Sequence, residues 1–85
     1  MKKLVEDLPG EGLTKLLGER VTLFCAIYIY TGKLIGVNDK FVLLGEAAIV
    51  YETGPFMEKN WKDVQPLPHS VYVMLACIES FMILK

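Results

Sequence analysis

The sequence lacks any apolar run long enough to cross a membrane. Its two longest apolar stretches, Leu23 to Tyr30 and Val71 to Ile78, fall far short of the roughly 18 residues that a spanning helix needs. Residues 1–10 carry positive charge, but acidic residues and a proline interrupt the apolar segment that a signal peptide requires. We therefore expect an intracellular, cytoplasmic protein with no membrane partner.

Cysteine and histidine are also scarce, which limits the chemistry available to the chain. Cys25 and Cys77 lie far apart, outside any Cys-x-x-Cys spacing, and each falls in an apolar strand-like run. This pattern favours two buried structural thiols. His69 is the single histidine, with no second ligand at a suitable spacing, and its neighbour Ser70 is too close in sequence to face it as a nucleophile. The sequence predicts no metal, no cofactor and no catalytic residue, so we do not expect an enzyme.

The chain has little excess of charge of either sign. Its formal net charge at pH 7 is −1, which gives no general attraction for the phosphates of nucleic acids. Binding to RNA would therefore need a local group of cations.

Apolar residues, in contrast, are abundant for so short a chain. They make up 53% of the 85 residues, more than the roughly 45–50% that is usual in soluble domains. A single domain of this size has a small interior, so part of this apolar surface is expected to face another subunit.

Three changes of composition divide this single domain, residues 1–85, into four segments. Residues 1–20 have leucines at helical spacing, and a short helix is expected to end at Gly18. Residues 21–52 are rich in strand-forming residues and punctuated by glycines, which predicts three strands with bends or bulges. Residues 53–70 predict a long exposed loop, and residues 71–85 two last strands that break at Glu79 and Ser80. The apolar residues at helical spacing in the first segment are Leu4, Val5 and Leu8, followed by Leu13, Leu16 and Leu17.

Both faces of the predicted strands are largely apolar. Along Val21 to Tyr30, apolar residues occupy the odd and the even positions alike. A lone antiparallel sheet would keep one face polar. One face is therefore expected to line the core, and the other to meet the N-terminal helix or a neighbouring subunit.

The order of the motifs resembles that of the Sm-like family, which includes Sm and LSm proteins and the bacterial RNA chaperone Hfq. A short helix is followed by Leu17-Gly18-x-x-Val21, then by Tyr30-x-Gly32-x-Leu34-x-Gly36, a polar loop and a Leu-rich strand. The resemblance implies a mainly β fold, in which a short N-terminal α-helix precedes a strongly bent five-stranded antiparallel barrel of the SH3-like type. It also implies a homo-oligomeric ring, closed by pairing of edge strands, whose number of subunits one chain does not reveal.

The same resemblance places a candidate RNA-binding site at Asn38, Asp39, Lys40 and Phe41. In one alignment, Asn38 takes the family's Asp position, Lys40 its base-stacking position and Val42 that of its base-reading Asn. In the other, which we prefer, Asp39 orders the loop, Lys40 replaces an amide and Phe41 supplies the stacking ring. The alternative to either is an ordinary turn with Phe41 in the core.

Other parts of the sequence depart from the family pattern. The family's second motif supplies a basic residue, but no cation occurs between Val71 and Leu84. A secondary patch, Lys59, Trp61 and Lys62, places cations around an aromatic ring in the 53–70 loop, which suits single-stranded nucleic acid, a protein partner or packing on the barrel itself. The expected function is a non-catalytic ring with a degenerate pocket for single-stranded RNA. The alternative is a ring-shaped scaffold that binds a protein partner through the loop and does not bind RNA.

Overall fold

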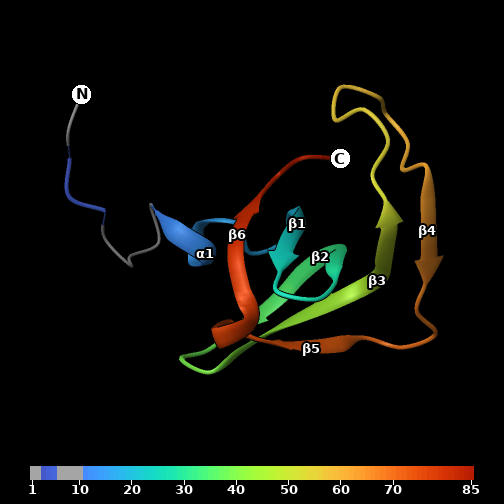
Figure 1. Ribbon diagram of the computed structural model, residues 1–85. Helices are drawn as coiled ribbons and strands as arrows, with labels where there is room; N and C mark the ends of the chain where they lie inside the picture. Colours follow the sequence, from blue (N-terminus) through green and yellow to red (C-terminus); the bar gives the residue numbers. More distant parts are fainter. Residues whose placement is uncertain (1–2, 6–10) are drawn as a thin grey trace.

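The computed structural model describes residues 3–5 and 11–85, and within them the regular structure is mainly β-sheet, with one short α-helix (Figure 1). This confirms the predicted mainly β fold. The predicted helical spacing at Leu8 lies outside the described residues. The elements are α1 (Gly12–Lys15), β1 (Arg20–Cys25), β2 (Ile29–Val37), β3 (Phe41–Glu52), β4 (Asp63–Pro66), β5 (Val71–Met74), the 3-10 helix η1 (Leu75–Cys77) and β6 (Ile78–Met82).

The helix is shorter than the leucine spacing suggested. It ends at Lys15, and a turn carries the chain to Gly18. Gly18 has a φ of 88°, the left-handed conformation that glycine adopts without strain, and its N–H donates to the Leu34 carbonyl at 2.7 Å. The glycine therefore redirects the chain into β1 and ties the entrance of the sheet to β2.

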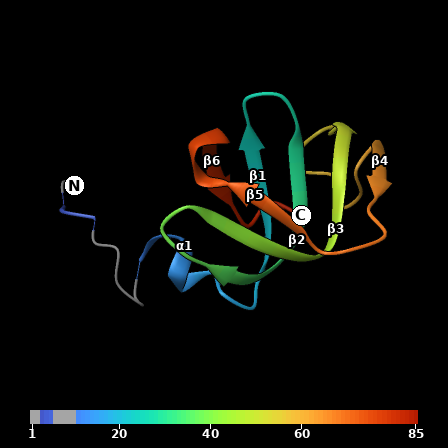
Figure 2. The same cartoon turned by 90° about the horizontal axis from the view of Figure 1, so that it is seen from below.

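All six strands belong to one antiparallel sheet, in the order β4-β3-β2-β1-β6, with β5 also pairing with β3 (Figure 2). The sheet curls, but its hydrogen bonding does not close into a barrel, because among the described residues β5 and β6 are joined by η1 rather than paired. The strongly bent five-stranded barrel that we predicted is therefore observed as a curled but open sheet of six strands.

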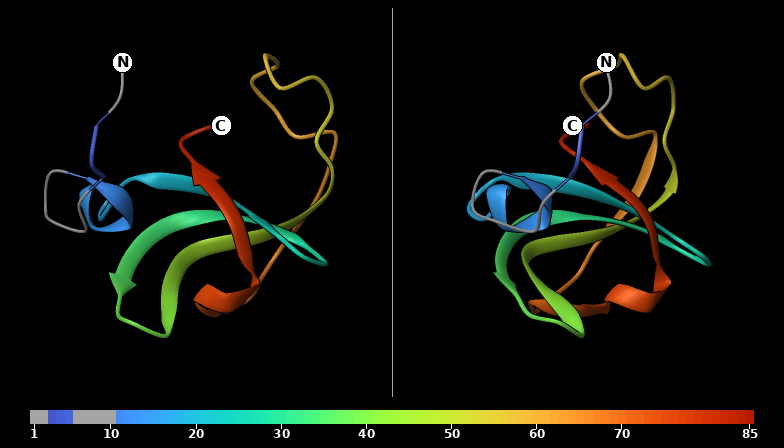
Figure 3. Two further views of the ribbon diagram at one scale, coloured as in Figure 1. Left: turned by 60° about the vertical axis from the view of Figure 1, so that its left-hand side comes forward. Right: turned by 90° about the vertical axis from the view of Figure 1, so that its left-hand side faces the viewer.

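The curl comes from a sharp bend in β3, visible in Figure 3. The register between β2 and β3 shifts between Thr31 and Lys33 and again between Leu34 and Gly36, which confirms the bulges predicted from the glycines. At the bend, Glu46 has a φ of 47°, which is unusual for a residue with a side chain. Gly32 allows the close approach opposite it, since a Cβ there would lie 3.0 Å from the Gly45 carbonyl oxygen.

The bend also explains why the sheet has six strands instead of five. The first half of β3 pairs with β5 and the second half with β4, so two short strands share one long partner. Pro66, the last residue of β4, and Pro68, which lies between β4 and β5, lack the N–H groups that a continuous ladder would need. The prediction of a loop through the whole of residues 53–70 is wrong, because Asp63–Pro66 pairs with the second half of β3 and forms β4.

The predicted break near the end of the chain lies elsewhere. It falls at η1, and Glu79 and Ser80 belong to β6. The polar pair that suggested a break instead marks an irregularity, because Phe24 pairs with Ser80 while Cys25 pairs with Ile78.

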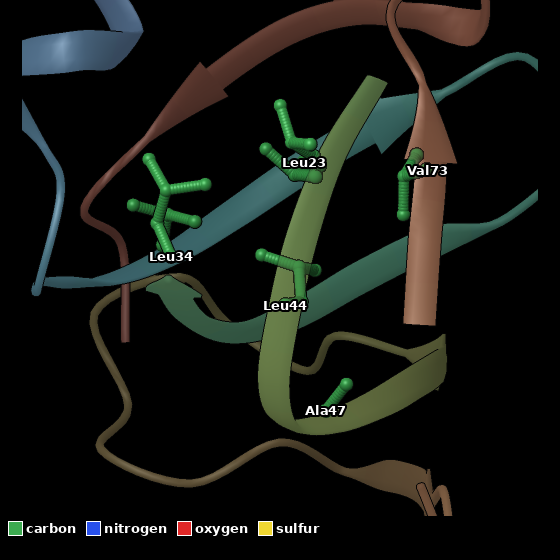
Figure 4. Close-up of a cluster of buried hydrophobic side chains, with 7 residues drawn as sticks. Leu23, Leu34, Leu44, Ala47 and Val73 are labelled. Carbon is green, nitrogen blue, oxygen red and sulfur yellow. The ribbon is translucent and has the colours of Figure 1, made fainter. Parts of the chain in front are cut away.

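One face of the curled sheet encloses the hydrophobic core (Figure 4). Leu13 and Leu16, from the helix and the turn after it, pack against this cluster, so the helical segment helps to cover the core. The buried cluster consists of Val21, Leu23, Leu34, Val42, Leu44, Ala47 and Val73.

The opposite face, which we call the outer face, is covered in part by the segment that follows β3. Thr22 and Thr31 are register partners on β1 and β2, and their side chains alternate with those of the core residues. Both are buried, at 0% and 1% exposure. The Phe56 ring lies edge-on against Phe24, with centroids 6.2 Å apart. The outer face is thus met by this loop, where the N-terminal helix or a second subunit was expected.

The two thiols do not share the buried environment that the sequence suggested. Cys25 is half-buried and Cys77 is exposed, so the prediction of two buried cysteines is wrong for Cys77. The reason is η1, which lifts Cys77 out of the strand pattern in which it would have faced the interior.

Candidate functional site

The turn between β2 and β3 is held by Asn38. Its side-chain Oδ1 accepts hydrogen bonds from the backbone N–H groups of Lys40 and Phe41, both at 2.8 Å, and its own N–H donates to the Phe41 carbonyl at 3.0 Å. This is a local side-chain-to-backbone pattern that Asn forms readily in turns. The ordering role expected of Asp39 therefore belongs to Asn38.

Asp39 and Lys40 are exposed at the tip of this turn. The carbonyl of Lys40 accepts a hydrogen bond from the Leu75 N–H at 2.9 Å, which ties the turn to η1. The turn is therefore a fixed platform that leaves the ammonium group of Lys40 in solvent.

Phe41 lies on the opposite face of β3 from Val42. Val42 is fully buried in the core, so it cannot contact a ligand, and the alignment that makes it a base reader has no structural support. Phe41 is half-buried, and its ring meets that of Tyr72 edge-on, with centroids 5.1 Å apart. The alternative in which Phe41 joins the core is therefore not observed.

A small hollow of about 170 Å³ lies beside this aromatic pair. Tyr72, which is 63% exposed, lines it together with Phe41 and Asn38. An exposed aromatic edge next to a lysine can stack a planar group and attract an anion. Of the four predicted residues, Asn38 and Phe41 line the hollow together with Tyr72, whereas Asp39 and Lys40 are not among its lining residues. The full lining of the hollow is Gly36, Val37, Asn38, Phe41, Leu43 and Tyr72.

Tyr72 is not among the residues predicted from the sequence, although its position in the strand-like run after the loop is a usable signal. β5 pairs with the first half of β3. In this register Val73 lies opposite Val42, and Tyr72 lies opposite Leu43. A search for aromatic residues at alternate positions of the strand after the loop would have found it.

The secondary patch is split by the fold. Lys62 forms an exposed ion pair with Glu52, at 3.4 Å, and such surface pairs contribute little. Trp61 is half-buried, and the Lys85 ammonium lies 4.7 Å from the centre of its ring. Lys59 and Trp61 line a cleft of about 500 Å³, which we call the outer cleft, and Lys62 is not among its lining residues.

No helix within residues 3–5 and 11–85 has the length and apolar character needed to cross a membrane. Over the same ranges, no three His, Cys, Asp or Glu side chains gather where they could hold a metal ion.

Comparison with protein-family models found no match to this chain. Searches of curated proteins and of solved structures found none either.

Proposed function

We propose that this protein is an Sm-like, non-catalytic ring protein that holds single-stranded RNA at the turn between β2 and β3. The observation that carries the proposal is the edge-on pair of the Phe41 ring and the exposed Tyr72 ring, next to a turn that Asn38 holds and that carries the exposed Lys40. In this proposal β4 and β5 together serve as the fourth strand of the family's bent barrel, and β6 serves as the fifth.

The free edges of the sheet support assembly into a ring. β6 ends one side of the sheet, and exposed apolar side chains, Phe81, Met82 and Ile83, lie on it or directly after it. On the other side, β5 exposes Tyr72 and Met74. Pairing β6 of one copy with the β4 and β5 edge of the next would satisfy backbone groups and cover apolar surface at once. Such a head-to-tail contact closes a ring when the rotation between copies is constant.

The ring compensates for weak individual sites. A base stacked on an aromatic side chain contributes roughly 1–3 kcal/mol, largely independent of its identity. Each subunit offers one lysine at the turn, and β5 and β6 contain no cation that could serve as the family's second basic residue. Identical weak sites around a ring hold one strand by avidity, so a degenerate pocket still gives useful binding.

A second candidate function is a ring-shaped scaffold that binds a protein partner through the loop after β3. Phe56 and Met57 favour it, because they are 53% and 97% exposed. The hydrogen bonds of Asn38 also favour the scaffold. Its carboxamide oxygen already accepts from two backbone N–H groups of the turn, so this oxygen is occupied and does not serve to bind an RNA base.

Two measurements test the proposal. Light scattering of the full chain should give a mass several times that of the 9.6 kDa subunit, and a monomer would exclude the ring. Short U-rich and A-rich RNAs should bind with an affinity that falls with salt, because bound lysines displace counterions from phosphates.

Point variants then locate the RNA. Lys40→Ala and Tyr72→Leu should weaken binding, whereas Tyr51→Leu, which removes an exposed tyrosine at the far end of β3, should leave it unchanged. A ring that binds no RNA at low salt, or whose affinity these two changes do not alter, would instead support the scaffold.

A further inference from the structure

The outer cleft has the size and lining of a site for a small organic molecule. Its volume is about 500 Å³, and pockets of roughly 300–1,000 Å³ accommodate ligands of this kind. It lies over the second half of β3, between the sheet and the segment that carries Trp61. No residue of the cleft belongs to the hollow beside Phe41. Its apolar wall is formed by Ala47, Ala48, Val64, Pro66 and Leu67.

The cleft carries an excess of positive charge in a protein that is slightly acidic overall. Three basic side chains, those of Arg20, Lys59 and Lys85, line it, against one acidic side chain among its described lining residues, that of Glu46. Arg20 donates one hydrogen bond to the Glu46 carbonyl at 3.1 Å, which uses one of the five N–H donors of a guanidinium group. The local field therefore favours an anion.

Lys85 gives this part of the cleft a fixed shape. Its ammonium donates to the carbonyl oxygens of Thr53, Pro55 and Asn60, at 2.9, 2.9 and 3.2 Å, while lying over the Trp61 ring. Carbonyl groups are dipoles without net charge, so they hold the ammonium in place without neutralising it. The indole and its cation are thus pre-positioned before any ligand arrives, which lowers the entropic cost of binding.

A buried hydroxyl without a partner supplies an independent sign of a ligand. Thr31 lines the cleft and is 1% exposed, and its Oγ1 has no hydrogen-bond partner within residues 3–5 and 11–85. Buried polar groups are nearly always hydrogen-bonded, so each exception needs an explanation. A polar atom of a bound molecule would satisfy this hydroxyl.

The backbone at the cleft is strained as well. Glu46, with its φ of 47°, lines the cleft and offers its carbonyl to Arg20. Strained residues of this kind persist where the surrounding structure holds them, and they gather at binding sites.

From these features we infer that the outer cleft binds a nucleotide, with its base against Trp61, its phosphate near Arg20 and Lys59, and a polar group bonded to Thr31. A planar ring and an anionic group in one molecule match the indole, the apolar wall and the cations together. This site is separate from the RNA contact at Lys40 and does not depend on it. The nucleotide is either a free mononucleotide or the 5′-phosphorylated end of an RNA strand.

Trp61 makes the test direct, because it is the only tryptophan in the chain. The full-length protein is titrated with adenosine 5′-monophosphate while the emission of Trp61 is followed. A saturable change is expected, and adenosine without phosphate should bind at least about tenfold more weakly, because it lacks the charge-assisted hydrogen bonds. A short RNA with a 5′-phosphate and the same RNA with a 5′-hydroxyl form the second arm. Saturation by the mononucleotide identifies a free ligand, and saturation by the phosphorylated RNA alone identifies a strand end.

A matched pair of variants tests the role of the orphan hydroxyl. Thr31→Val keeps the shape of the side chain and should weaken nucleotide binding about tenfold, as expected for one lost hydrogen bond. Thr22→Val removes the second buried hydroxyl that lacks a partner among the described residues; it does not line the cleft, and its loss should leave the affinity unchanged. Lys59→Gln should weaken binding of the phosphate, whereas Lys40→Ala should have no effect on it.

Three results would overturn the inference. One is the absence of any saturable response to the mononucleotide and to both RNAs. Another is equal binding of adenosine and its monophosphate, and the third is an equal effect of Thr22→Val and Thr31→Val. Because Lys40→Ala affects only the turn, loss of RNA binding at the ring and loss of the cleft site can be told apart.

Discussion

Replacing Gly32 by alanine tests whether the close approach of β2 and β3 sets the curl of the sheet. A Cβ at this position would lie 3.0 Å from the Gly45 carbonyl oxygen, 3.1 Å from the Ala47 Cα and 3.2 Å from the Leu44 Cβ. None of these atoms is the end of a flexible side chain, so the two strands would have to separate. Gly36 offers the matched control, because among the described residues a Cβ there would have within 4 Å only two side-chain atoms of Leu43, at 3.4 and 4.0 Å.

The magnitude follows from two opposing effects. Overpacking in a tight interior costs about 1–3 kcal/mol, while the loss of glycine's freedom in the unfolded chain returns about 0.4–1 kcal/mol. Gly32→Ala should therefore lower the free energy of unfolding by about 1–2 kcal/mol, whereas Gly36→Ala should leave it unchanged or raise it by up to about 1 kcal/mol.

Urea denaturation followed by circular dichroism measures both changes. The variants must be compared at equal protomer concentration, because assembly would add a concentration-dependent contribution to stability. For a domain of this size, each kcal/mol corresponds to a shift of about 4–8 °C in Tm. If Gly32→Ala is as stable as Gly36→Ala, the strands can separate freely and the bend does not depend on this glycine.

The remaining predictions concern the turn and the thiols. Asn38→Ala should lower the free energy of unfolding by about 1–2 kcal/mol, since two backbone N–H groups lose their acceptor, while Asn38→Asp keeps an acceptor and should stay near the wild-type value in the same urea assay. Equal stability of the two variants would contradict this reading of the turn. Burial, with smaller effects of Cys77 and Glu79, raises the pKa of Cys25 from 9.0 to about 11. At about pH 8 an alkylating reagent should therefore modify the exposed Cys77 well before Cys25, as peptide mass spectrometry would show, and equal rates would be contrary to it. Because the unfolded chain ionises this thiol at lower pH than the folded chain does, the contribution of Cys25 to stability is complete below about pH 9 and declines as the pH rises towards 11.

The sequence anticipated those features that depend on local chemistry. The glycines of residues 21–52 marked the register shifts of β2 and β3, because a missing side chain is what a bulge or a close approach requires. Asn38, Asp39 and Lys40 formed a turn between apolar runs, as such residues do. What could not be read locally was which polar residue of the turn would accept the backbone N–H groups.

Features that depend on distant partners escaped prediction. β4 ends in a proline and has little strand propensity of its own, and it forms because the second half of β3 offers it an edge. Lys85 and Trp61 are far apart in sequence, so no periodicity links the ammonium to the ring. The burial of Thr31 depends likewise on the segment after β3 folding back over the outer face, which polar composition alone does not indicate.

The bend in β3 joins these features in one physical argument. A straight strand of this length would offer a single continuous edge for pairing on the side away from β2, and one continuous outer face. Because β3 turns at Glu46, its first half places Phe41 against β5 and Tyr72, and its second half places Ala48 against β4 beneath the outer cleft. The unfavourable φ of Glu46 thus accompanies the bend that places the Phe41–Tyr72 pair and the outer cleft on the two halves of one strand. Changes at the turn and changes in the cleft act on opposite halves of β3, and residues so separated usually contribute independently. If Lys40→Ala and Thr31→Val combined gave more than the sum of their separate effects on RNA binding, the two surfaces would form a single path for one strand.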